Sequence, residues 1–206
     1  MVYLPPHFTE TREAVLVAHI ERYDFALLVT DRDGLVASQV PVLVERRAGR
    51  LHLCGHLARP NPQCAAFDGG EALAVFTGPH AYISPSWYAA GPAVPTWNYA
   101  TVHAYGPVRA VEDKDWLAGL LRRLSERHEA REAAPWRMQD QPERFLDGMM
   151  NGIVGFEIAV DRLEGKFKLS QNRPAGDRPR ICAALEARDD PDSHALARLM
   201  REREGL

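Results

Sequence analysis

The sequence has few cysteines and lacks the glycine-rich loops that commonly hold nucleotide phosphates. Its three cysteines are an odd number at unrelated spacings, so the pattern does not suggest a disulfide framework. Neither a GxxxxGK[ST] nor a GxGxxG stretch is present, which excludes the usual P-loop and dinucleotide-binding signatures. A bound nucleotide would therefore have to be held mainly by side chains.

Two further absences limit the expected partners. No apolar run approaches the length of a membrane-spanning helix. The 28 Asp and Glu residues outnumber the 25 Lys and Arg residues, and the net charge is −3, which gives no general attraction to nucleic acid or to an anionic membrane. The first residues, MVYLPPHFTETR, lack the basic and then apolar pattern of a secretory leader. We expect a cytoplasmic protein without a membrane partner, in which any anion site is local.

Alternating apolar residues and turn signals predict a mainly antiparallel protein. Strands are expected at 25–30, 35–45, 50–56, 71–78, 97–112 and from 153 into the segment that begins at Gly165. The first three of these strands suggest a meander, since DRDG and RRAG are hairpin sequences. The segment 79–96 contains four prolines and is predicted to be a loop.

Helical periodicity is clearest at 113–132, where apolar residues recur at helical spacing. Shorter helices are expected after Thr9 or Thr11 and in QPERFLDGMMNG, and two more in the tail. The fold class predicted is mainly β (α+β), an antiparallel barrel or sandwich decorated with helices. Residues 1–173 are expected to form one domain and residues 174–206 a C-terminal helical arm.

The segment 79–99 concentrates five aromatic residues among its prolines. These residues are Tyr82, Trp87, Tyr88, Trp97 and Tyr99. Rings held by rigid prolines could face a planar ligand or a partner subunit, or they could cover one end of the barrel. The sequence leaves these two interpretations open.

The stretch HLCGH places His52, Cys54 and His56 on one face of a predicted strand. Three such ligands could in principle meet at zinc, iron or haem. Same-face side chains on one strand diverge along its length, however, and no carboxylate or second cysteine pair lies near them in the sequence. We therefore expect no metal site here.

The stretch GKFKLSQNR suggests an anion site. In an extended chain Phe167 and Leu169 face one way, while Lys166 and Lys168 face the other with no carboxylate between them. A phosphate would turn the repulsion between the two ammonium groups into attraction. His56, Arg59 and Asn61 in HLARPNPQ, with Ser38 and Gln39 on the second strand, could supply further donors. The alternative is a solvated basic strand edge that resists aggregation.

Four segments carry a resemblance to a known family: FTGPHAYISPSWY, VPTWNYATVHAYG, HLARPNPQ and GKFKLSQNR. They closely resemble the PaiB family, described as FMN-binding negative transcriptional regulators, and the resemblance runs from MVYLPPHF to Arg173. It implies the FMN-binding split β-barrel shared with pyridoxamine 5′-phosphate oxidase-like proteins. It also implies a homodimer with the flavin sites between the subunits.

The resemblance further implies a set of FMN-binding residues. The phosphate would be bound by His56, Ala58, Arg59 and Asn61. The flavin or its ribityl chain would be flanked by Ser38, Gln39 and Val40 and approached from the side by Thr101 and His103. The same site, or that of the partner subunit, would be reached by Lys166, Lys168 and Gln171. Many superfamily members carry an Arg and a Lys on the second strand, where this chain has ASQVPVLV. No catalytic residue is predicted.

Three functions remain open from the sequence: an FMN-binding regulator, a flavin-dependent oxidoreductase, and a haem-binding relative that uses His52 or His56. The regulatory role, and DNA as a partner, come from the family resemblance alone. The tail arginines that could neutralise DNA phosphates alternate with acidic residues, which is typical of a salt-bridged helical arm. We expect direct DNA binding to be weak or absent.

Overall fold

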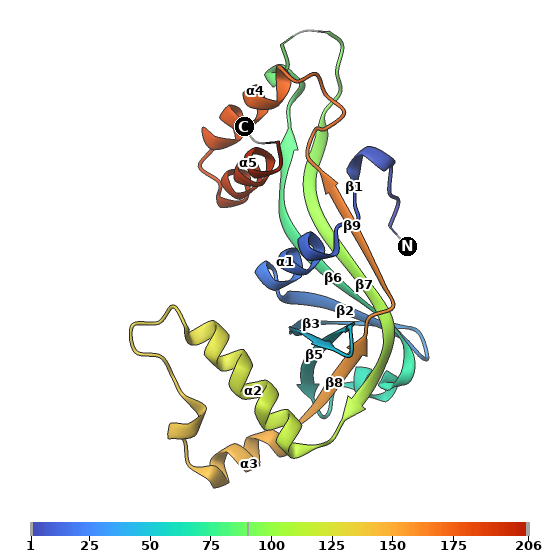
Figure 1. The fold of residues 1–206 in the computed structure, drawn as a ribbon, viewed down its shortest axis with the longest axis vertical. Helices are drawn as coiled ribbons and strands as arrows, with labels where there is room; N and C mark the ends of the chain where they lie inside the picture. Colours follow the sequence, from blue (N-terminus) through green and yellow to red (C-terminus); the bar gives the residue numbers. More distant parts are fainter. Residues whose placement is uncertain (1, 90, 205–206) are drawn as a thin grey trace. The chain divides into compact units, whose positions relative to one another are not determined.

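The structure is a computed structural model that describes residues 2–89 and 91–204. The chain divides into two compact units built from interleaved segments. Unit 1 comprises Met1–His19, Thr77–Val102 and Glu164–Leu206, and unit 2 comprises Ile20–Phe76 and His103–Leu163. Two long strands, β6 (Asp68–Ile83) and β7 (Thr96–Val111), contribute residues to both units (Figure 1).

Unit 2 is built on an antiparallel sheet. Besides parts of β6 and β7, its strands are β2 (Phe25–Asp31), β3 (Leu35–Pro41), β4 (Leu43–Arg47), β5 (Arg50–Ala58) and β8 (Ile153–Ala159). The order along the sheet is β3-β2-β6-β7-β8-β5-β4. Alternate residues of β2, including Ala26 and Leu28, point into the core, as the period of two along a strand requires.

The predicted meander is wrong. Strand β2 pairs with β3 and β4 pairs with β5, both antiparallel, but β3 and β4 lie at opposite ends of the sheet order. The chain leaves β3 at Pro41 and enters β4 at Leu43, while Val42 donates its backbone N–H to Asp24 O at 2.9 Å. The predicted strand 35–45 is therefore two strands with different partners.

The helices of unit 2 follow β7. Helix α2 (Lys114–Glu129) is capped by Asp113, whose carboxylate accepts a hydrogen bond from Trp116 N at 2.7 Å. Its buried leucines pack with Leu43 of β4, with Cys54 of β5 and with Met150 of helix α3 (Glu143–Asn151). Short 3-10 turns, η2 (Pro62–Ala66) and η4 (Met138–Asp140), complete the unit. Within residues 2–89 and 91–204, no helix is long and apolar enough to cross a membrane.

Unit 1 joins the two ends of the chain. Strand β1 (Thr9–Glu10) pairs antiparallel with β9 (Arg162–Lys168), with Thr9 opposite Lys166. The turns η1 (Pro6–Phe8) and η3 (Pro85–Trp87) and most of helix α1 (Glu13–Arg22) also belong to this unit. The tail forms α4 (Asp177–Glu186) and α5 (Pro191–Glu204), which contact each other. Ile181, Cys182, Leu185, Leu196, Ala197 and Met200 of these helices have no exposed surface.

Two other predicted boundaries differ from the structure. Strand β6 continues through Pro79 to Ile83, so the predicted loop at 79–96 is shorter than expected. Ala81 and Ile83 are buried, while His80 and Tyr82 are exposed, which is a strand pattern that the prolines obscured. The predicted strand beginning at 153 is interrupted after Ala159, and β9 begins at Arg162. The helices expected after Thr11, at 113–132, in 141–152 and in the tail are confirmed.

Candidate functional site

Two lysines of β9 meet aromatic rings in unit 1. Lys166 is only 8% exposed, and its ammonium group lies 5.2 Å from the ring centre of Tyr3 and 5.6 Å from that of Tyr99. These distances allow cation–π attraction. Thr101 lies on the same face of β7 as Tyr99, because side chains two residues apart share a face of a strand. We call Lys166, Lys168, Tyr99 and Thr101 the lysine face.

Lys168 is held at a fixed position in unit 1. Its ammonium group donates to Trp97 O at 2.6 Å and to the Thr96 hydroxyl, and it lies 5.9 Å from the ring centre of Phe8. Burial, then the nearby charges of Lys166 and Arg173, lower the pKa of Lys168 below its ordinary value. All the charges that shift this pKa are positive, so the lysine face has a local positive potential.

Exposed aromatic side chains adjoin Lys168 through Trp97. The Trp97 ring is 53% exposed and lies 6.1 Å from the ring of Tyr82, at a nearly perpendicular angle. It also lies 6.2 Å from the ring of His80. Of the aromatic residues predicted to act together, Tyr82, Trp97 and Tyr99 are thus close to the lysine face, whereas Tyr88 is buried and its ring lies 4.3 Å beneath the guanidinium group of Arg173.

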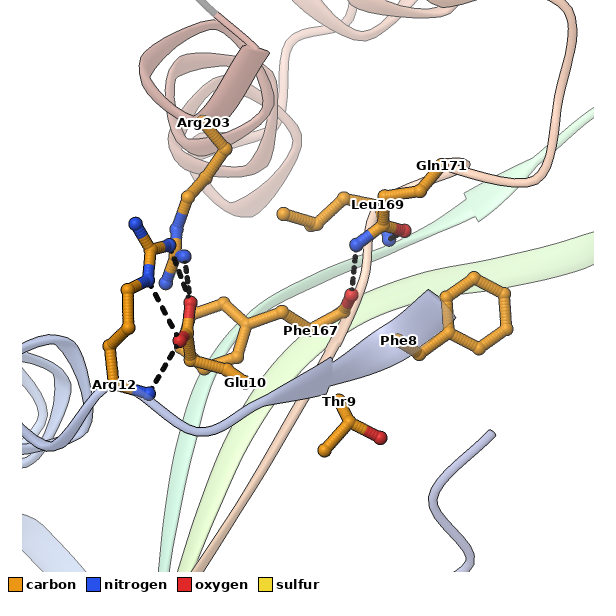
Figure 2. Close-up of a pocket in the computed structure, with 8 residues that line it drawn as sticks. All are labelled: Phe8, Thr9, Glu10, Arg12, Phe167, Leu169, Gln171 and Arg203. Carbon is orange, nitrogen blue, oxygen red and sulfur yellow. Dashed lines mark hydrogen bonds and ion pairs between the residues drawn. The ribbon is translucent and has the colours of Figure 1, made fainter. Parts of the chain in front are cut away.

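The Gln171 side chain is hydrogen-bonded to the backbone at the end of β9. Its amide oxygen accepts a hydrogen bond from Leu169 N at 2.7 Å, and its amide nitrogen donates to Phe167 O, so the side chain closes the end of β9. Figure 2 shows Gln171 with Phe167 and Leu169 at the wall of a cavity in unit 1. Phe167 and Leu169 are 4% and 2% exposed, and Lys166 is buried as well, at 8%.

In unit 2 the structure brings Ser38 and Asn61 together. The Asn61 amide donates to the Ser38 hydroxyl at 3.0 Å, and its Oδ1 accepts from Gln63 N at 2.9 Å. Gln39 is the exposed neighbour of Ser38 on β3, and Val40 is buried in the core. Polar groups from β3 and from the loop after β5 therefore meet, as the predicted site requires.

Arg59 makes its contacts elsewhere in unit 2. It forms a two-point ion pair with Glu112 at 3.0 and 3.2 Å. It also donates to Asn151 O at 3.0 Å and to Ile153 O at 2.9 Å, at the end of α3. The Glu112 carboxylate raises the pKa of Arg59 above its ordinary value. The guanidinium group thus fixes the end of α3 in the described structure.

The remaining predicted residues lie on the strands of unit 2. Ala58 ends β5 and is exposed, and burial lowers the pKa of His56. His103 Nδ1 lies 3.5 Å from the Tyr105 hydroxyl. Among residues 2–89 and 91–204, no three His, Cys, Asp or Glu side chains gather as metal ligands. In the HLCGH stretch, His52 Nδ1 lies 3.2 Å from Glu157 Oε1, and Cys54 packs against α2 and α3.

Comparison with known proteins identifies the family. Residues 2–162 match the model of a domain family described as "Putative FMN-binding domain". The chain is also 34% identical over 204 residues to the protease synthase and sporulation protein PAI 2 of Bacillus subtilis, covering 98% of each chain. The chain belongs to the PaiB family of FMN-binding domains. The sequence-based recognition is thus confirmed, and FMN is the cofactor of this domain.

A further relative and a solved structure are also similar to this chain. An uncharacterized protein of Emericella nidulans, AN0679, is 33% identical over 182 residues, covering 73% of this chain and 72% of that protein. The FAD and heme binding protein of Mycobacterium smegmatis superposes with a TM-score of 0.55 at 17% identity, covering 85% of this chain and 79% of that one. The predicted fold, a mainly β split barrel decorated with helices, is confirmed.

Sequence reasoning about this PaiB-family chain missed several residues near the lysine face. Tyr3 and Phe8 reach the lysines because β1 pairs with β9, and two-residue strands such as β1 leave no periodic signal. Glu10, Arg12 and Arg203, which form an ion cluster in unit 1, were missed for the same reason. Glu10 and Arg12 are neighbours in the sequence, but Arg203 lies 193 residues from Glu10 and reaches it only where the two ends of the chain meet.

Proposed function

We propose that this PaiB-family protein binds FMN with the phosphate against the lysine face. The observation that supports the proposal is the position of Lys168, which is partly buried near the positive charges of Lys166 and Arg173. Burial and these two charges lower its pKa. A phosphate carries nearly two negative charges and would relieve this unfavourable charge arrangement. The Thr96 hydroxyl, already in contact with Lys168, would offer a further donor.

The other predicted residues form part of the same proposal. Ser38 and Asn61, joined by a hydrogen bond in unit 2, would supply neutral donors to the ribityl chain or the phosphate. Gln39, Val40, His56, Ala58, Thr101, His103 and Gln171 are proposed to line the flavin site of the same subunit or of its partner. Arg59 would join them only by giving up its contacts with Glu112 and the end of α3.

An FMN titration followed by flavin fluorescence tests the phosphate site. Lys168→Met is expected to weaken FMN binding at least about tenfold, because a charge-assisted hydrogen bond to phosphate is lost. Lys114→Met, which removes an exposed lysine at the start of α2, is the matched control and leaves the affinity unchanged. If Lys168→Met and Arg59→Ala both bind FMN as tightly as wild type, the phosphate lies elsewhere.

The pH dependence gives an independent test of the phosphate site. Because the pKa of Lys168 is lowered, its positive charge is lost at a lower pH than that of an ordinary lysine. FMN affinity is therefore expected to fall as the pH rises through this lowered pKa. Lys168→Met removes that fall, and an unchanged pH profile in the variant would assign the titration to another group.

We also propose that the protein is a homodimer. Tyr82 and Trp97, beside the lysine face, are 38% and 53% exposed, and a second copy would cover such rings. Light scattering at micromolar concentration is expected to give the dimer mass for wild type and a lower mass for Trp97→Glu. A monomeric wild-type protein contradicts the proposal that FMN lies at a homodimer interface.

We infer that the regulatory role of the family works in this protein without strong direct DNA binding. The tail arginines already contact protein groups in unit 1. Arg178 donates to Gln171 O and Arg173 O, Arg180 to Trp87 O, Arg201 to Glu186, and Arg203 to Glu10. These contacts support the interpretation of the tail as a structural arm.

Fluorescence anisotropy with DNA from the gene's own promoter region tests this inference at near-physiological salt. Weak binding that is equal for an unrelated DNA of the same length is expected. Sequence-selective binding that weakens steeply with added salt, and that is reduced by Arg198→Gln on the exposed side of α5, would establish direct DNA recognition instead.

A further inference from the structure

Unit 1 contains a small cavity beside Phe167, near the end of β9, and Leu169, which follows the strand (Figure 2). Its volume is about 190 Å³. Eight residues line it: Phe8, Thr9, Glu10, Arg12, Phe167, Leu169, Gln171 and Arg203. The cavity adjoins the lysine face, because Phe8 lines the cavity and its ring centre also lies 5.9 Å from the Lys168 ammonium group. The charged residues of the cavity, Glu10, Arg12 and Arg203, are not among those of the proposed phosphate site.

One side of the cavity carries an excess of positive charge. Arg12 and Arg203 both point toward the single carboxylate of Glu10 (Figure 2). Glu10 accepts from Arg12 Nε at 3.0 Å, Arg12 Nη2 at 2.7 Å, Arg12 N at 2.8 Å and Arg203 Nη1. These donors lower the pKa of Glu10 to about 2, so two positive charges face one negative charge near neutral pH.

Arg203 has hydrogen-bonding capacity left over. Its Nη2 atom is buried and has no hydrogen-bond partner within the described part of the chain. The guanidinium group stacks over the Phe167 ring, with 4.3 Å between the guanidinium carbon and the ring centre, which fixes its plane. A buried N–H group without an acceptor costs free energy, so an anionic oxygen beside it would be favourable.

The other side of the cavity is apolar, and its remaining polar groups are already bonded. Phe8, Phe167 and Leu169 are 7%, 4% and 2% exposed. The Gln171 amide bonds the backbone of Leu169 and Phe167, and the Thr9 hydroxyl donates to Pro5 O at 3.0 Å. The site therefore offers a cationic donor at one side and an apolar surface at the other.

We propose that this cavity binds a small organic carboxylate with an apolar body. The carboxylate would bond Arg203 and be drawn by Arg12, and the apolar body would pack on Phe8, Phe167 and Leu169. An inorganic anion fits less well, because it cannot use the apolar half. Since Arg203 belongs to α5 and Glu10 to β1, the ligand would join the C-terminal helix to the N-terminal strand of unit 1.

Benzoate is a suitable probe, with benzyl alcohol as the neutral analogue and inorganic phosphate as the anion without an apolar body. Calorimetric titration of the full-length protein is expected to give a Kd for benzoate of about 1 mM or tighter, with little binding of the other two. Benzoate is also expected to raise the Tm. The proposal is wrong if benzoate does not bind at millimolar concentration, or if benzyl alcohol binds equally well.

Variants locate the binding site. Arg203→Met is expected to weaken benzoate binding about tenfold, because the charged donor is lost. Arg201→Met, which lies on the same helix but pairs with Glu186 at 2.7 Å, should leave it unchanged. If Arg203→Met does not fold, Arg12→Met provides the test instead. The Arg12 side chain is 68% exposed, so this variant should fold, and it should weaken benzoate binding severalfold.

FMN titrations test whether this cavity and the lysine face bind different ligands. The Kd for FMN should be the same for wild type, Arg203→Met and Arg12→Met, and benzoate should not displace FMN. Competition between benzoate and FMN would place both in one site and overturn the proposal of a separate cavity ligand. Retained benzoate affinity in the folded arginine variants would overturn it as well.

Discussion

Replacing Glu157 by glutamine is expected to destabilise the protein more than any exchange of an exposed carboxylate. Glu157 lies in unit 2 on β8 and is 3% exposed. It pairs with Arg47, accepts from Arg109 at 3.0 and 3.2 Å, and lies 3.2 Å from His52 Nδ1. Glu157→Gln keeps the size of the side chain and removes the charge that these groups share.

The expected loss follows from the burial of the charge. Removing one partner of a fully buried ion pair typically costs about 3–5 kcal/mol. Arg47 and Arg109 are 38% and 61% exposed, so water compensates them in part, and the glutamine oxygen still accepts one hydrogen bond. We expect a loss of about 2 kcal/mol in the free energy of unfolding.

The pH dependence of unfolding should identify the charge as the cause. Burial alone would raise the pKa of Glu157, but hydrogen bonds from Arg47 and Arg109, with the charges of these arginines, together lower it below its ordinary value of 4.5. A lowered folded-state pKa contributes stability that is present above the unfolded-state pKa and is lost as the pH falls through the folded-state pKa. The difference between wild type and Glu157→Gln should therefore be largest near neutral pH and shrink below about pH 4.5.

Urea unfolding at several pH values measures both effects. The matched control is Glu112→Gln, which removes a carboxylate that also pairs with an arginine but is 62% exposed, and which should cost at most about 1 kcal/mol. Equal losses for the two variants, or a Glu157→Gln loss that stays constant between pH 7 and pH 3, would refute the reasoning from burial.

Two further predictions follow from close contacts and thiol burial. Gly106→Ala should lower the free energy of unfolding by about 3 kcal/mol or more, or prevent folding, because a Cβ atom at Gly106 would lie 2.1 Å from Ala159 O. Gly119→Ala in α2, where the space around the Cβ position is open, should instead stabilise the protein by up to about 1 kcal/mol. Urea unfolding of the two variants measures both effects. A thiol reagent at pH 8 should modify Cys64 and leave Cys54 intact until the protein unfolds, because Cys54 is fully buried and burial raises its pKa to about 12; rapid loss of both thiols would contradict the described packing.

The sequence predicted most elements of the fold because they follow local periodicity. Helix α2 combines an Asp113 cap with leucines at helical spacing, and β5 has the strand pattern expected at 50–56. Partner strands are not visible in such patterns. Apolar and polar residues alternate in the same way before and after Val42, yet β3 and β4 lie at opposite ends of the sheet order. The predicted meander therefore had the right strands but the wrong pairing.

The lysine face could be predicted only in part. Alternation predicted that Phe167 and Leu169 face away from Lys166 and Lys168; the apolar pair is buried, but so is Lys166. That Lys166 is itself buried beneath Tyr3 could not be predicted, because the contact depends on pairing across almost the whole chain. The ion pair between Arg59 and Glu112 is similarly long-range and has no signal in the sequence.

The pairing of β1 with β9 sets an order for biosynthesis. Thr9 stands opposite Lys166, so at synthesis rates of about 5–20 residues per second Thr9 is made roughly ten to thirty seconds before its partner strand. During that interval the N-terminal segment has no strand to pair with, while the residues of unit 2, Ile20–Phe76 and His103–Leu163, are being translated. A ribosome that stalls before β9 would therefore release a chain whose N-terminal strand is open to chaperones and proteases, and whose lysine face was never made.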